Sequence, residues 1–126
     1  MARKPRPAAK RKVSPRERGK APPGGVLRVG KTSIVLDVLR TTCGTQNLIW
    51  MWPKPTPIVG IFVNLGICSI EVQMAGVGKP SKVMIPSRAG AAGAQILGHP
   101  AATTVTIDCL GTVAGGECVV LYLLIW

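Results

Sequence analysis

Acidic, aromatic and histidine residues are scarce in this chain of 126 residues. It has five Asp and Glu, one Tyr, one Phe, three Trp and a single histidine, His99, which precedes Pro100 in a Gly/Ala-rich stretch. Ser87, His99 and Asp108 can be written down as nucleophile, base and acid, but nothing in their spacing favours such a set. General acid–base catalysis needs positioned groups that are nearly absent here, so we expect no enzyme and no cofactor.

Motifs that hold metals or phosphates are missing too. The chain has no paired carboxylates, no zinc-ligand spacing and no P-loop, and we therefore expect no metal site. Its cysteines are widely spaced, form no C-x-x-C pair and have no histidine close by in sequence: Cys43, Cys68, Cys109 and Cys118. We interpret them as small, buried, apolar side chains, and disulfides of unknown connectivity stay open as the alternative.

Long hydrophobic runs are absent as well. The longest, residues 119–126, is far shorter than the roughly 20 apolar residues that span a bilayer as a helix. No apolar stretch of suitable length follows the basic start of the chain, as it would in a secretory signal. We expect no membrane partner and assign the hydrophobic 47% of the chain to a core or an interface.

Positive charge, in contrast, is abundant and concentrated at the start of the chain. The net charge is +11, and nine of the sixteen Lys and Arg residues precede Gly24. These nine are Arg3, Lys4, Arg6, Lys10, Arg11, Lys12, Arg16, Arg18 and Lys20. Glu17 is the single acid among them, so this segment carries a net charge of +8. Such segregation indicates a polyanionic partner, and nucleic acid is the default because its charge density is the highest.

The basic segment cannot form a core of its own. Residues 1–25 contain five prolines and three glycines, and one valine is the only sizeable apolar residue after Met1. Buried surface therefore cannot offset the chain entropy, and we predict a disordered basic arm that ends in a Pro/Gly hinge at residues 22–25. Residues 26–126 then form a single folded domain.

That domain has the pattern of a small all-β fold. We predict strands within residues 26–40, 46–52, 57–65, 68–74, 82–86, 103–109 and 117–126. The first segment bends or divides near Gly30, the second ends at Pro53, and the glycines of residues 87–102 indicate a loop. Seven or eight short strands between Gly- and Pro-rich turns favour a sandwich or a barrel.

Side-chain alternation marks the buried faces of two strands. Apolar residues on one side are Cys68, Ile70, Val72 and Met74 in the first, and Val105, Ile107 and Cys109 in the second. The 117–126 strand is apolar almost throughout, as expected where both of its faces are covered.

The domain is too apolar for the surface of a lone monomer. Only seven charged residues follow Arg40: Lys54, Glu71, Lys79, Lys82, Arg88, Asp108 and Glu117. We expect the excess apolar area to be buried between copies of the chain, and one unusually apolar core is the alternative.

A short Arg/Lys/Pro arm, a Gly-rich hinge and a charge-poor domain of seven to eight strands resemble the coat (capsid) proteins of small icosahedral RNA viruses and satellite viruses. The resemblance rests on this organisation of the whole chain. It implies a single jelly-roll β-sandwich of antiparallel strands, residues 26–126, that self-assembles into an icosahedral shell of roughly 60 copies or a multiple of 60. It also implies a location in the virion, with assembly in the host cytoplasm.

In such coat proteins the arm points inward and holds the packaged nucleic acid, RNA more often than DNA. Carried over to this chain, the nine basic residues between Arg3 and Lys20 would neutralise phosphates without reading sequence, and Arg28 and Lys31 would extend the basic surface. The alternative is a ribosomal or other nucleic-acid-binding β-barrel protein with a basic extension, although residues 54–126 are nearly neutral.

Overall fold

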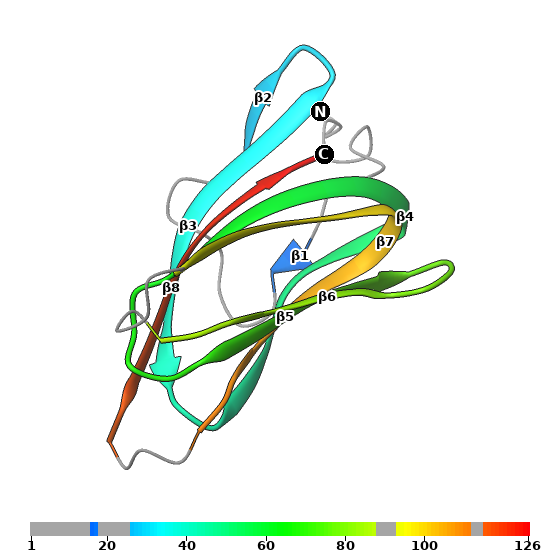
Figure 1. Cartoon of the computed structure of the whole chain (residues 1–126). Coiled ribbons are helices and arrows are strands. Elements are labelled where there is room, and N and C mark those ends of the chain that lie inside the picture. Colours follow the sequence, from blue (N-terminus) through cyan, green and yellow to red (C-terminus); the bar gives the residue numbers. More distant parts are fainter. Residues whose placement is uncertain (1–15, 18–25, 88–92, 112–114) are drawn as a thin grey trace, which may run out of the picture.

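The computed structural model describes residues 16–17, 26–87, 93–111 and 115–126. Every regular element in these residues is a β-strand (Figure 1), and the predicted all-β class is thereby confirmed. The strands are β1 (Arg16–Glu17), β2 (Leu27–Val29), β3 (Thr32–Thr42), β4 (Thr45–Asn64), β5 (Ile70–Gly76), β6 (Ser81–Ile85), β7 (Ala94–Cys109) and β8 (Glu117–Ile125). Apart from β1, the arm for which disorder is predicted lies outside the described residues.

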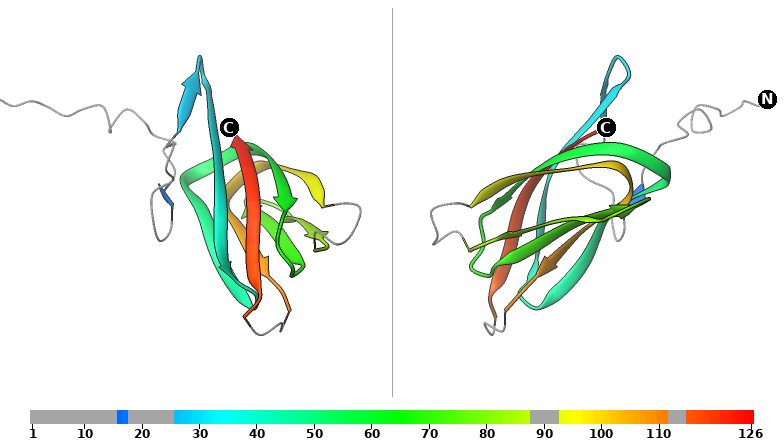
Figure 2. Two further views of the ribbon diagram at one scale, coloured as in Figure 1. Left: turned by 90° about the vertical axis from the view of Figure 1, so that its left-hand side faces the viewer. Right: turned by 45° about the vertical axis from the view of Figure 1, so that its right-hand side comes forward.

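The strands form one continuous antiparallel sheet that curls over on itself. Their hydrogen-bonded order is β2-β3-β8-β4-β7-β5-β6, and β1 pairs with β4. The long strands β4 and β7 pair with each other over most of their length, but their outer neighbours differ. Residues 59–64 of β4 pair with β8, whereas residues 102–109 of β7 pair with β5. β4 and β7 therefore pass together from the layer of β3 and β8 to the layer of β5 and β6 (Figures 1 and 2).

The passage of β4 between layers occurs at its prolines. The prediction that a strand ends at Pro53 is wrong, because β4 continues to Asn64. Its pairing with β7 is nevertheless interrupted there, with register shifts between Met51 and Thr56 and again before Ile58. Proline lacks an N–H and cannot donate to a ladder, so it is tolerated where the ladder is already broken.

One further boundary differs from the prediction, and one agrees. Residues 94–102, predicted as a loop, form the first half of β7, because pairing with β4 outweighs the local glycine content. Segment 26–40 divides at Gly30, as predicted. Gly30 lies in the β2–β3 turn with a positive φ of 64°, a conformation that glycine adopts readily. The predicted buried faces of the 68–74 and 103–109 segments are confirmed.

The core lies between the two layers and includes an aromatic cluster. The rings of Trp50, Trp52 and Trp126 have centroids 5.3–6.5 Å apart. The Trp50 Nε1–H donates to the Tyr122 hydroxyl at 3.1 Å, so this buried polar group is satisfied. Trp50, Trp52 and Phe62 are almost completely buried, and this part of the apolar excess noted in the sequence belongs to the core.

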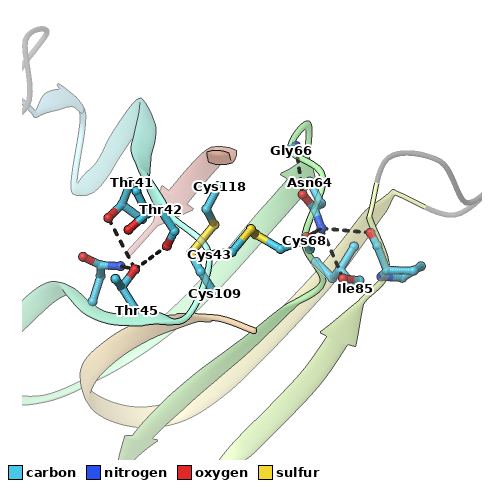
Figure 3. Close-up of a disulfide and its surroundings, with 12 residues drawn as sticks. Thr41, Thr42, Cys43, Thr45, Asn64, Gly66, Cys68, Ile85, Cys109 and Cys118 are labelled. Atoms are coloured by element: carbon cyan, nitrogen blue, oxygen red, sulfur yellow. Dashed lines mark hydrogen bonds between the residues drawn. A yellow bond between two sulfur atoms is a disulfide. The ribbon is translucent and has the colours of Figure 1, made fainter. Parts of the chain in front are cut away.

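All four cysteines are paired, so the interpretation of free, buried thiols is wrong. Cys43 bonds to Cys68 and Cys109 bonds to Cys118, with Cα–Cα distances of 5.9 and 6.2 Å. Figure 3 shows the two bridges side by side. Each bridge joins a strand end of one layer to a strand end of the other. The sandwich is thus closed at this end by disulfides and at the other by the curving strands β4 and β7.

A buried asparagine organises the turn beside the disulfides. The Asn64 side-chain amide donates to the carbonyl oxygens of Cys68, Ile85 and Pro86 at 2.8–3.3 Å, and its Oδ1 accepts from the Gly66 N–H at 3.0 Å (Figure 3). Asn64 is 1% exposed. It therefore holds the β4–β5 connection against the end of β6.

Replacement of Asn64 by Leu is expected to destabilise the domain by about 3 kcal/mol, because several buried backbone groups lose their hydrogen-bond partner. Chemical denaturation of the oxidised protein measures this difference. Asn47→Leu is the matched control, since the half-buried Asn47 amide makes one long side-chain hydrogen bond, to Thr45 at 3.4 Å. A loss for Asn64→Leu no larger than that for Asn47→Leu would contradict this role.

Candidate interaction surface

The outer side of the β3–β8–β4–β7 layer is lined by aliphatic side chains. Residues directly opposite each other in an antiparallel pair point to the same side of the sheet, so the register identifies the members of each row. The central row is Leu36, Leu123, Ile61 and Ile96. The rows beside it are Ile34, Ile125, Val59 and Gly98, and Val38, Leu121, Val63 and Ala94. Leu27 of β2 extends the second row opposite Ile34. We call these thirteen residues the aliphatic face.

Much of the aliphatic face is open in a single copy of the chain. Leu36 is 59% exposed, Val59 47% and Ile96 68%, while Leu121, Leu123 and Ile125 are half-buried. The prediction that both faces of the 117–126 strand are covered is thus wrong for one chain alone. Four strands at about 4.8 Å and five residues at about 3.3 Å give this face a projected area of roughly 300–350 Å². The largest apolar patch on a typical monomer has a comparable area and is often functional.

The outer side of the other layer has a different character. Its rows contain Gln46, Asp108, Glu71 and Met84, then Leu48, Thr106, Gln73 and Lys82, then Met51, Thr104 and Ala75. Lys82 Nζ and the Glu71 carboxylate lie 3.9 Å apart across this polar face. No charged side chain lies within the rows of the aliphatic face, which ends near the exposed Arg40–Glu117 ion pair at 3.0 Å. The sandwich therefore has one apolar and one polar outer side.

The structure does not bring together the groups of the conceivable catalytic set. His99 is buried and not a loop residue: its Nδ1 accepts from the Ala101 N–H at 2.9 Å, and its Nε2 lies 3.0 Å from the Lys79 carbonyl oxygen. Asp108 lies on the polar face, on the opposite side of β7. Among the described residues, no group of three His, Cys, Asp or Glu side chains is placed to hold a metal ion. The described residues also contain no helix that is long and apolar enough to cross a membrane.

Few of the predicted nucleic-acid-binding residues can be placed. Arg28 and Lys31 are exposed in the β2–β3 hairpin, which projects from the body of the domain (Figure 1). Arg16 lies in β1, whose two residues pair with Trp50 and Met51 of β4. The other eight lie outside the described residues: Arg3, Lys4, Arg6, Lys10, Arg11, Lys12, Arg18 and Lys20. Their binding of a polyanion stays a prediction.

Neutralising the nine arm cations with Gln is expected to weaken binding to single-stranded DNA or heparin and to flatten its salt dependence. Each lost phosphate contact should reduce the slope of log K against log salt by about 0.7. Fluorescence anisotropy over a series of salt concentrations measures both quantities. Lys79→Gln with Lys82→Gln is the control, because these exposed lysines lie outside the arm. Unchanged affinity in the arm variant would contradict the prediction.

The comparisons with known proteins return little. No family model matches the chain, and no curated protein matches it. One solved structure is similar, from work on Bacillus endospore appendages described as a novel family of disulfide-linked pili. It has a TM-score of 0.44 and 14% identity, covering 77% of this chain and 90% of that one. At this TM-score the likeness establishes neither fold nor function.

This finding nevertheless corrects the interpretation drawn from the resemblance. The structural neighbour is a protein of bacterial pili and not a viral coat protein. The prediction of an RNA-packaging icosahedral capsid is therefore wrong. A basic segment followed by a charge-poor β domain is a general arrangement that many unrelated proteins share, so it does not identify a function.

The aliphatic face was only partly visible in the sequence. The chain's low charge after Arg40 indicated an excess of apolar surface, but not its position. A signal was present in 34–38 and 121–125, where apolar residues occupy both alternating sets of positions, apart from Asp37. Assigning one of these sets to the outside requires the register of β3, β8 and β4, which the sequence alone does not provide.

Proposed function

We propose that this protein is a structural subunit that associates with further copies of itself through the aliphatic face. The proposal depends on one observation. Uncharged rows of aliphatic side chains cross four paired strands, and Leu36, Val59 and Ile96 among them are exposed to solvent. Removing exposed apolar area of this kind from water stabilises the associated state. The part of the chain described by the structure offers no competing metal-binding cluster.

A second copy is an occupant that the charges at this face allow. Two chains that each carry a net charge of +11 repel one another, and this repulsion is smallest where the approaching surfaces carry no charge. The aliphatic face meets this condition, and a face without charges is complementary to itself. A standard interface buries about 800 Å² per partner, so the face would form its apolar centre and the surrounding polar residues its rim.

The difference between the two outer sides favours a closed pair. In a two-fold arrangement the same patch is used by both copies, and the polar faces with Asp108, Glu71 and Lys82 stay in water. Association through the aliphatic face alone therefore stops at a dimer. Larger assemblies require a second contact elsewhere on the subunit.

We infer that the subunit is a single jelly roll. Support comes from the pairings when β4 and β7 are each counted as two strands at their bends. One set of four is then β3, β8, residues 56–64 and residues 94–102, and the other is residues 45–51, residues 104–109, β5 and β6. Two four-stranded sheets connected in this order are the jelly-roll arrangement.

We also propose that the protein works in an oxidising environment. Two disulfides account for every cysteine of the chain. Disulfides persist outside the reducing cytosol and are rare within it, apart from proteins of hyperthermophiles. A durable, cross-linked subunit is suited to an external structure.

Sedimentation equilibrium of the full, oxidised chain over a range of concentrations tests the proposed function. We expect reversible association to a dimer or a larger species that persists in high salt, because apolar contacts are not screened by ions. Association that disappears in high salt would instead indicate charge contacts. A chain that stays monomeric at every concentration would overturn the proposal.

A further inference from the structure

One edge of the sheet, beside the aliphatic face, has no partner strand along most of its length among the described residues. β3 pairs with β8 along residues 34–42, but on its other side β2 reaches only residues 32–34. Ser33 and Trp126 exchange both of their backbone hydrogen bonds, at 2.7 and 3.0 Å. Since such pairs alternate along an antiparallel ladder, the N–H and C=O groups of Leu36, Val38 and Arg40 point away from β8. No strand among the described residues pairs with them. We call residues 36–42 the β3 edge.

Side chains of the protein itself occupy part of this edge. The Val38 N–H donates to Asp37 Oδ1 at 2.8 Å, and the Thr42 carbonyl oxygen accepts from the Thr45 hydroxyl at 2.8 Å. Asp37 lies opposite the buried Tyr122, so its half-buried carboxylate is on the core side of β3. An inward-pointing charge on an edge strand opposes the addition of another strand, because that strand would remove the charge from water.

We propose that the β3 edge is a second association surface of this protein, closed by Asp37, and that its partner is the β3 edge of a second copy. In an antiparallel pairing with a two-fold axis at Val38, each Val38 N–H would donate to the other Val38 carbonyl, and Leu36 would lie opposite Arg40. The pairing would also join two aliphatic faces side by side, since Leu36 and Val38 belong to both surfaces. The inference stands apart from the proposed function, because Asp37 keeps this edge unpaired in the wild type.

Two substitutions separate the charge of Asp37 from its hydrogen bond. Asp37→Asn keeps an oxygen that accepts from the Val38 N–H but removes the charge, whereas Asp37→Val removes both. Asp108→Asn is the matched control, since it removes the same charge from the polar face, away from the edge. Sedimentation velocity with light scattering on the full, oxidised chain gives the mass of each variant, and circular dichroism confirms that each is folded.

We expect Asp108→Asn to keep the wild-type mass and Asp37→Val to form species of at least twice that mass. Asp37→Asn should reach the same mass as Asp37→Val or a mass between those of Asp37→Val and the wild type. An Asp37→Val protein that is folded and keeps the wild-type mass would overturn the inference, and so would an equal increase in Asp108→Asn. If Asp37→Val does not fold, the mass of Asp37→Asn decides in the same way. A monomeric wild type with a dimeric Asp37→Val would support the β3 edge while contradicting the proposed function.

Discussion

Reduction of both disulfides is expected to unfold this domain, or to bring it close to unfolding, at room temperature. In the chain-entropy description, closing loops of 25 and 9 residues stabilises the folded state by about 3.5 and about 2.6 kcal/mol. The loops 43–68 and 109–118 do not overlap, so the two effects should nearly add. Their sum of about 6 kcal/mol is comparable with the whole stability of a typical domain, about 5–15 kcal/mol.

Thermal and denaturant unfolding with and without a reducing agent measures this effect. Paired Ala substitutions at Cys43 with Cys68, and at Cys109 with Cys118, separate the two bridges and need no reductant. Removal of the Cys43–Cys68 bridge should cost more, because it closes the longer loop. A reduced protein with the unfolding midpoint of the oxidised one would contradict the view that the bridges close this end of the sandwich.

A lysine in the aliphatic face is expected to weaken self-association by roughly 100-fold or more. Leu36→Lys, Val59→Lys and Ile96→Lys each place an ammonium group at the centre of the proposed contact, where its burial without a partner costs about 3 kcal/mol. The two-fold arrangement doubles each substitution and opposes like charges. Since all three residues are exposed in a single copy, the folded monomer should lose little stability.

Met84→Lys is the matched control for these variants. Met84 is 54% exposed on β6, so the substitution adds the same charge and removes a similar apolar side chain on the polar face. Its dissociation constant, measured by sedimentation equilibrium, should stay within a few-fold of the wild type. Equal weakening by Met84→Lys and Ile96→Lys would mean that net charge, and not the aliphatic face, controls association.

The sequence is sufficient to predict those elements whose signal is local. The alternation of Ile70, Val72 and Met74 identifies a strand with one buried face, because the side-chain period of a strand is two residues. Glycine at position 30 likewise marks the β2–β3 turn through its positive φ. Both features depend on neighbouring residues alone.

The features that require contacts distant in sequence were not predicted. β4 continues past Pro53 and Pro55 because both of its halves pair with β7, while only the second half also pairs with β8 in the other layer. The pairing of Cys43 with Cys68 depends on two strand ends that meet only in the folded sandwich. The aliphatic face depends on the joint register of four strands, and its central residues Leu123 and Ile61 look like core residues in the sequence.

Site-specific photo-crosslinking tests most directly whether the aliphatic face is the contact between copies. A benzophenone amino acid is placed at Ile96 in one protein and at Met84 in another, and the oxidised chains are irradiated at a concentration at which the wild type associates. The proposed function predicts covalent dimers from position 96, with the crosslink mapped by mass spectrometry to the aliphatic face of the other copy, and few from position 84. Crosslinks from position 84 alone, or crosslinks from position 96 that map to the polar face, would contradict it.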